Sequence, residues 1–211
     1  MKEAAGDPQY GGWKFRVAVL AIVCPAMCGM VGCSLSGPRP AEYVLGAMPT
    51  ATANTVPETE LPVVEVKRVQ LPAYLDTTDI LTRRGNQLIP SSTGRWGERL
   101  SVGMTRALTA SLAARLTRMV VTATPPIGRP AWQIFVDVSA FEPRSDHQVV
   151  LVARWTIADG ASRRILVAEQ ASLVEAIAGS DDGAVVAAMS RVLEELAKRL
   201  AAGIERTRRQ G

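Results

Sequence analysis

Three segments decide the fold: WQIFVDVS at residues 132–139, QVVLVARWTI at 148–157 and ILVAEQASL at 165–173. In each of them apolar residues recur at every second position, which gives an extended strand one apolar face. Turn-forming residues separate the segments, at 143–146 and at 159–160. The sequence therefore predicts a half-buried meander of three antiparallel strands.

Further periodic segments predict two helices and several shorter strands around this meander. Apolar residues recur every three or four positions from Trp96 to Leu116 and again from Asp181 to Arg206, which predicts two amphipathic helices. Ser92 or Thr93 is placed to cap the first helix. The shorter β patterns lie at 64–69, 79–83, 87–89 and 119–124.

Together these elements predict an α+β fold. We expect a two-layer sandwich in which two long amphipathic helices pack on one face of a largely antiparallel sheet, within a domain at residues 63–211. Trp96, Trp132 and Trp155 each fall in register with the apolar face of their element, so we expect them in the core rather than in a ligand site.

The N-terminal segment predicts a lipoprotein signal peptide. Lys14 and Arg16 precede an uncharged, mostly apolar run, which is typical of a secretory signal, and its prolines and glycines disfavour a permanent membrane span. The run ends in Met30-Val31-Gly32-Cys33, which resembles a bacterial lipobox. In such lipoproteins the chain is cut before the cysteine and the sulfur is lipidated. We therefore expect a signal peptide at 1–32 and lipid attachment at Cys33, with a plain buried cysteine as the alternative.

The residues after Cys33 predict a tether between lipid and domain. All three cysteines precede it, so the mature chain would keep only the lipidated one and form no disulfide. Prolines and threonines recur up to Pro62, so we expect a lipidated N-terminus and extended spacer at 33–62, interrupted by one possible edge strand at 43–45. By the sorting rule of such lipoproteins, Ser34 implies the outer membrane.

The sequence offers little catalytic equipment. His147 is its only histidine and lies in a predicted turn, where a general base would not be held against a nucleophile. Turn-forming aspartates are common, so Asp76 and Asp79 are weak candidates for paired catalytic carboxylates. We expect no metal and no cofactor. The net charge of +4 is not gathered in a basic stripe, so we also expect no nucleic acid as a partner.

Three short motifs follow one another in a recognisable order: Leu71-Pro72-Ala73-Tyr74-Leu75-Asp76, Ile80-Leu81-Thr82-Arg83 and Arg95-Trp96-Gly97-Glu98-Arg99-Leu100. With the helix, the three strands and the closing helix that come after them, the sequence resembles the ABC-type transport auxiliary lipoproteins, the PqiC-like (YmbA-like) family, from the lipobox onward. The resemblance gives a structural or partner-binding role to the motif residues Leu71, Pro72, Tyr74, Leu75, Asp76, Arg83 and Trp96.

The resemblance implies a non-catalytic lipoprotein on the periplasmic face of the outer membrane. It would work with an ABC permease system and an MCE-domain (mammalian cell entry) protein that move lipids between the two membranes. It would anchor the far end of that conduit as a ring of identical copies, a homo-oligomer. Two alternatives stay open. One is a stand-alone periplasmic enzyme that uses a metal or carboxylates, with Asp76, Asp79, Asp137 and His147 as the residues to test. The other is a lipid- or peptidoglycan-binding module that acts alone.

Overall fold

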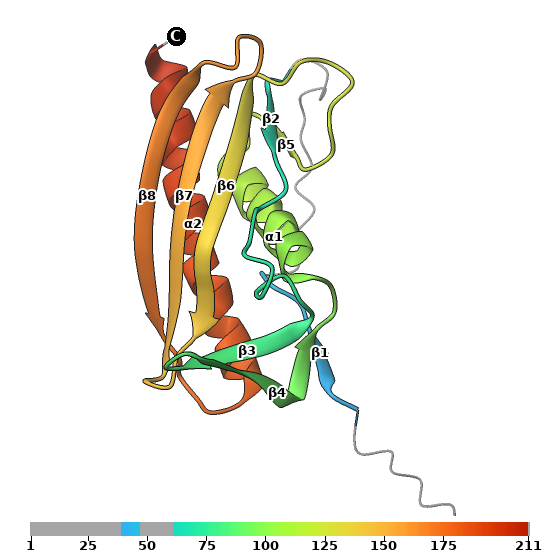
Figure 1. The fold of residues 1–211 in the computed structure, drawn as a ribbon. Helices are drawn as coiled ribbons and strands as arrows, with labels where there is room; N and C mark the ends of the chain where they lie inside the picture. The colour runs from blue at the N-terminus through green and yellow to red at the C-terminus, as the bar shows by residue number, and fades with distance from the viewer. Residues whose placement is uncertain (1–38, 47–60, 211) are drawn as a thin grey trace, which may run out of the picture. The chain divides into compact units, whose positions relative to one another are not determined.

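The computed structural model describes residues 39–46 and 61–210 (Figure 1). The predicted signal peptide, Cys33 and much of the predicted tether lie outside these described residues. The described residues all belong to the folded domain.

The predicted meander is present as β6 (Trp132–Pro143), β7 (Gln148–Asp159) and β8 (Ile165–Ala176), paired antiparallel. Each strand runs a few residues beyond its periodic segment. A register shift in β6 between Val138 and Ala140 reverses the alternation, so that Phe141 turns to the core side and Glu142 to the other. This bulge explains why the period-2 pattern breaks before the strand ends.

Two short strands extend the meander into a five-stranded sheet. β2 (Val63–Val66) lies between β5 (Val120–Thr122) and β6 and is parallel to both, which gives the order β5-β2-β6-β7-β8. The predicted α+β sandwich is confirmed. Its sheet is largely antiparallel, as predicted, and the short parallel strands β2 and β5 make it mixed. Parallel neighbours need a long crossover, and here the chain between β2 and β5 supplies it.

A second, three-stranded sheet has the order β1-β4-β3. β3 (Asp79–Arg84) and β4 (Gln87–Trp96) form a hairpin, and β1 (Ala41–Tyr43) pairs parallel to the end of β4. The hairpin turn passes through Gly85, whose φ of +59° suits glycine. Figure 1 shows this sheet at the end of the domain where β6 finishes.

Both helices, α1 (Leu100–Arg115) and α2 (Asp182–Gln210), lie on one face of the five-stranded sheet, as predicted (Figure 1). The carboxylate of Asp181 caps α2, accepting the N–H of Ala184 at 2.7 Å. α2 approaches β7 so closely that a Cβ on Gly203 would lie 2.7 Å from Cδ1 of Ile157. The core therefore lies between the two helices and the sheet.

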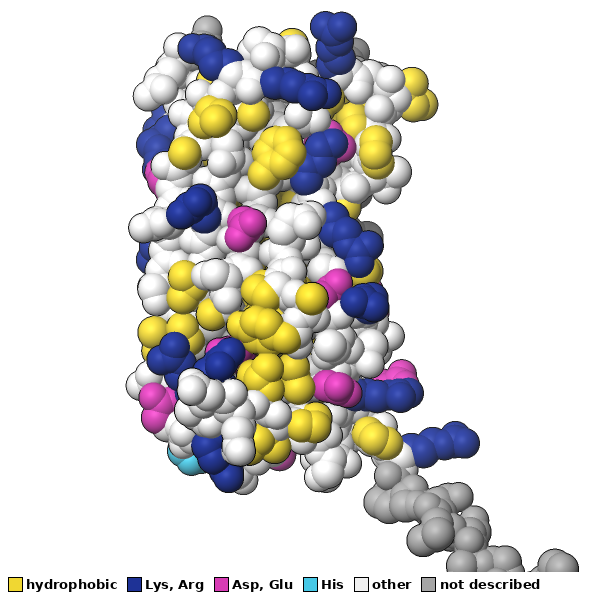
Figure 2. Space-filling view, viewed as in Figure 1, with side chains coloured by type: hydrophobic (Ala, Val, Ile, Leu, Met, Phe, Trp, Pro, Cys, Tyr) yellow, Lys and Arg dark blue, Asp and Glu magenta, His cyan; other side chains and the backbone are white. Residues whose placement is uncertain are grey.

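The core contains the large side chains that the sequence places there. Of the three tryptophans predicted there, Trp96 and Trp155 are buried, and Trp132 is partly buried and packs against the core cluster. Phe141 is buried in the core as well. The opposite face of the sheet is left open by the helices, and Figure 2 shows charged side chains of both signs scattered among apolar ones on it.

Part of the expected tether is folded onto the domain. β1 pairs with β4, and the next residues bring Leu45 into the core. Gly46, at φ +79°, donates its N–H to the Ser190 hydroxyl of α2 at 3.1 Å. A Cβ on Gly46 would meet that of Ala107 at 3.0 Å. Residues 41–46 are thus wedged against both helices.

The predicted start of the first helix is wrong. Trp96 is the last residue of β4, because its backbone is paired with Tyr43 and its N–H donates to the Thr78 carbonyl oxygen at 2.7 Å. Ser92 and Thr93 therefore lie in a strand and cap nothing on α1. The hydroxyl of Thr93 instead donates to the carboxylate of Asp182 at 2.6 Å and ties β4 to the start of α2.

Two phenylalanines of β6 test the assignment of the sheet's faces. Phe141→Ala is expected to lower the free energy of unfolding by about 3 to 5 kcal/mol, because it leaves a cavity in the core. Phe135→Ala, on the open face, is the matched control and should cost far less, since that side chain is 43% exposed. Urea unfolding followed by circular dichroism measures both, and equal losses would contradict the assignment.

Candidate functional site

The first family motif forms the turn that leads into β3. The carbonyl oxygen of Pro72 accepts the N–H groups of Leu75 and Asp76 at 2.9 and 3.2 Å. Leu75 is buried in the core, and Leu71 packs against it. Tyr74 is the one residue of this motif with a large, exposed hydrophobic side chain. The apolar motif residues therefore act mainly by packing.

Asp76 caps α1 from outside the helix. Its Oδ1 accepts the N–H of Ser101 at 3.0 Å, and the neighbouring Thr77 carbonyl oxygen accepts that of Leu100 at 3.1 Å. Arg99 donates to the Asp76 carboxylate at 3.3 Å and to its carbonyl oxygen at 2.6 Å. Burial raises the pKa of the Asp76 carboxyl, but these hydrogen bonds and the Arg99 charge outweigh it, so the pKa lies below its ordinary value.

Arg83 joins the small sheet to the large one. Its Nε and Nη2 donate to the two carboxylate oxygens of Glu142 on β6, and the Glu142 residue is 2% exposed. Nη2 also donates to the Tyr74 hydroxyl at 3.3 Å, and the guanidinium carbon lies 5.7 Å from the centre of that ring. The hydrogen bond to Glu142 raises the pKa of Arg83 above its ordinary value.

The seven motif residues are therefore brought together around one junction. Leu71, Pro72, Leu75 and Asp76 hold the loop and the start of α1, Tyr74 and Arg83 join the sheets, and Trp96 closes β4 over the core. Their contacts are those of an architectural cluster.

The catalytic candidates are not assembled into a site. Asp76 is committed to the helix cap, Asp79 begins β3 and is exposed, and Asp137 lies in the middle of β6 on the open face. His147 is exposed in the turn after β6, with a φ of +58°. Within residues 39–46 and 61–210, no three histidine, cysteine or acidic side chains are grouped to hold a metal ion.

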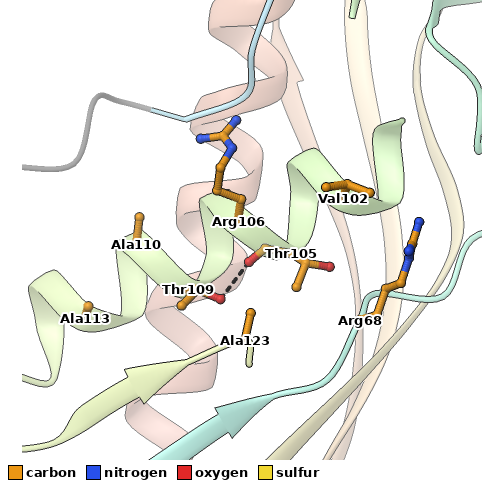
Figure 3. A pocket seen from close by; sticks show the side chains of 8 residues that line it. All are labelled: Arg68, Val102, Thr105, Arg106, Thr109, Ala110, Ala113 and Ala123. Atoms are coloured by element: carbon orange, nitrogen blue, oxygen red, sulfur yellow. Dashed lines mark hydrogen bonds between the residues drawn. The ribbon is translucent and has the colours of Figure 1, made fainter. Parts of the chain in front are cut away.

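A groove of about 490 Å³ runs along α1 (Figure 3). Six of its lining residues come from α1, and the other two follow β2 and β5. The lining residues are Val102, Thr105, Arg106, Thr109, Ala110, Ala113, Arg68 and Ala123.

The lining of the groove is more apolar than its composition indicates. The Thr105 hydroxyl donates to the Ser101 carbonyl oxygen at 2.7 Å and accepts the N–H of Val69 at 3.0 Å. The Thr109 hydroxyl donates to the Thr105 carbonyl oxygen at 2.7 Å, the dashed line in Figure 3. Because both hydroxyls are occupied by the backbone, the two threonines add mainly their methyl groups to the apolar lining.

The two arginines of the groove differ in how their charge is balanced. Arg106 donates to the Glu98 carboxylate at 2.8 Å and to the Leu45 carbonyl oxygen at 3.2 Å. Arg68 donates from Nε and Nη2 to the Ser101 hydroxyl at 3.2 and 2.8 Å, and no carboxylate among the described residues forms an ion pair with it. The groove thus has an apolar floor and, at its edge, one cation that no carboxylate of the described residues balances.

Neither this groove nor the role of Glu142 was predicted from the sequence. The apolar stripe of α1 is evident in the sequence, and the opposite face of the helix is unusual too. The helix LSVGMTRALTASLAAR has no acidic residue, and its only cations are Arg106 and Arg115. An ordinary surface helix is charged on that side. Glu142 could not be paired with Arg83 from the sequence, because the bulge decides which way it points.

A family model described as the ABC-type transport auxiliary lipoprotein component matches residues 43–201. The chain belongs to this family, and the resemblance seen in its motifs is confirmed. It is thus an auxiliary lipoprotein of ABC-type transport, and such membership assigns it to the cell envelope and to an accessory role. None of the helices that the structure describes is both long and apolar enough to cross a membrane.

Solved structures agree on the fold. The chain is similar to a crystal structure of an uncharacterized protein, with a TM-score of 0.67 at 18% identity, over 79% of this chain and 99% of that one. It is also similar to a protein from Xanthomonas campestris, with a TM-score of 0.60 at 15% identity, over 81% and 95%. No curated protein matches the chain by sequence.

Removing the external cap is expected to destabilise α1. Asp76→Ala should lower the free energy of unfolding by about 1 kcal/mol near neutral pH, the usual loss for a helix cap. Asp76→Asn is the matched variant, because its amide oxygen still accepts the Ser101 N–H but gives Arg99 no charge.

The Asp76 contribution also predicts a pH dependence. Since the folded-state pKa is lowered, the charge-dependent stabilisation is present above the unfolded carboxyl pKa of about 3.9 and is lost as the pH falls through the folded value. The gap between wild type and Asp76→Asn in urea unfolding should therefore close in acid. If the difference in unfolding free energy between wild type and Asp76→Asn is the same in acid as at neutral pH, this interpretation is contradicted.

The ion pair between the sheets should show strong coupling. Arg83→Met is expected to cost about 3 kcal/mol of unfolding free energy, because Glu142 stays buried without its counter-charge. The double variant Arg83→Met/Glu142→Met removes both charges and should recover most of that loss. A double-mutant cycle measures the coupling, and a double variant as unstable as Arg83→Met would count against it.

Proposed function

We propose that this chain is a lipid-anchored, non-catalytic docking or anchoring subunit of an ABC/MCE-type system that moves lipids between the inner and outer membranes. The observation that carries the proposal is the match to the transport auxiliary lipoproteins, which starts at residue 43, shortly after the predicted lipid-attachment residue Cys33.

The anchor is argued from the order of segments along the chain. Met30-Val31-Gly32 would form the recognition flank for cleavage after the signal at 1–32, and Cys33 would carry the lipid. Ser34 favours the periplasmic face of the outer membrane. A chain with two or three acyl groups is held firmly in a bilayer, whereas one acyl chain binds only marginally.

The non-catalytic role is supported by what the polar residues do. Asp76 and Arg83, the charged residues of the family motifs, are engaged in a helix cap and in an ion pair between sheets. Both side chains are partly buried and hold parts of the fold together, whereas catalytic groups must reach a substrate. The MCE-domain protein and the ABC permease are the partners that the family resemblance implies, with several copies of this chain at one conduit.

The proposal predicts a specific association in the cell envelope. The full-length protein, extracted with mild detergent, should co-purify with the MCE-domain protein of the same cell. Cys33→Ser should abolish fractionation with the outer membrane, because it removes the lipidated sulfur.

Ser34→Asp is the matched control for location. It keeps the lipid at Cys33 and should move the protein toward inner-membrane fractions. A wild-type protein that elutes as a lone monomer without the MCE-domain protein contradicts the docking role. A Cys33→Ser protein that stays in the outer membrane contradicts the anchor.

A further inference from the structure

The exposed sides of the two helices differ in composition. The exposed side of α2 is covered with charges paired to one another or to neighbours, among them Arg191 with Glu175 and Arg199 with Glu195. α1 has Val102, Ala110 and Ala113 along the groove. Val102 is 36% exposed. Apolar side chains in a concave surface are the usual lining of a small-molecule site.

The charge beside this lining indicates the kind of ligand. Arg68 is held by the Ser101 hydroxyl through Nε and Nη2, which orients the guanidinium and leaves its other N–H donors for a further acceptor. With no ion-pair partner among the described residues, it suits an anion. An apolar groove with one oriented cation at its edge suits an amphiphile, with the apolar part in the groove and an acidic headgroup at the cation.

We propose that the groove along α1 binds one acyl chain of a phospholipid, with the headgroup phosphate at Arg68. The volume of about 490 Å³ lies in the lower half of the range for small-molecule sites, which fits a single chain better than a whole lipid. The groove chemistry calls for an acidic amphiphile, and the choice of a phospholipid rests on the proposed role in lipid transport.

Small side chains on α1 leave room for the acyl chain along the helix. Ala110 and Ala113 are small lining residues toward the end of α1 (Figure 3), so an acyl chain at this place can lie close to the helix. Each buried methylene contributes roughly 0.8 kcal/mol. A bulky residue at Ala113 would fill this path without disturbing the core, because Ala113 is exposed.

Photo-crosslinking of the full-length protein in living cells tests the proposal. The photoreactive amino acid p-benzoylphenylalanine replaces Val102 in cells labelled with radioactive phosphate. Illumination should give a labelled phospholipid adduct of the protein. The matched control is the same amino acid in place of Phe135, an exposed aromatic on the open face of the sheet. It should give little or no lipid adduct.

Three further variants are each combined with the probe at Val102. Ala113→Trp blocks the groove and should abolish the adduct, whereas Ala114→Trp, on the next exposed residue outside the lining, should leave it unchanged. Arg68→Glu should lower the yield about tenfold, the effect of losing one charge-assisted hydrogen bond. Urea unfolding of each variant confirms that it is folded.

The proposal is overturned if no lipid adduct forms at Val102, if the probe at Phe135 gives an equal yield, or if Ala113→Trp has no effect in a folded protein. An adduct with another polypeptide, or within the chain, assigns this helix face to protein contacts instead. The same experiment in cells lacking the MCE-domain protein separates the two proposals. An adduct there upholds the groove whether or not the docking role stands.

Discussion

Asp76, in the loop before β3, holds the N-terminus of α1, and the start of that helix depends on this contact. A helix leaves its first N–H groups without partners inside the helix, and α1 has no capping side chain of its own. Asp76 supplies the acceptor for Ser101, and Arg99 binds Asp76 in return. Because Leu75 beside it is buried in the core, the cap ties the start of α1 to the core.

The family motifs therefore describe the architecture more than the working surface. In this chain Asp76 caps a helix, Arg83 joins two sheets, and Leu75 and Trp96 are buried in the core. The surfaces left for partners or ligands lie elsewhere, on the outward side of α1 and on the open face of the sheet (Figure 2).

The sequence predicts well the elements whose burial is periodic, and poorly those whose place depends on distant contacts. The meander and both helices follow from local patterns. The end of β4 does not: Trp96 continues the apolar stripe of α1, yet its backbone is paired with Tyr43 and Thr78, segments far away in the sequence. Asp76 looks like an ordinary turn residue until the fold brings Ser101 beside it, and the groove needs both the outward side of α1 and Arg68.

We regard the domain as the folded part of an acylated polypeptide. Intact-mass and N-terminal peptide mass spectrometry of the processed protein, purified from envelope membranes, measures this directly. We expect a chain that begins at Cys33 and carries a diacylglyceryl group on its sulfur. A chain that keeps residues 1–32, or one with an unmodified thiol at Cys33, would contradict the acylated anchor.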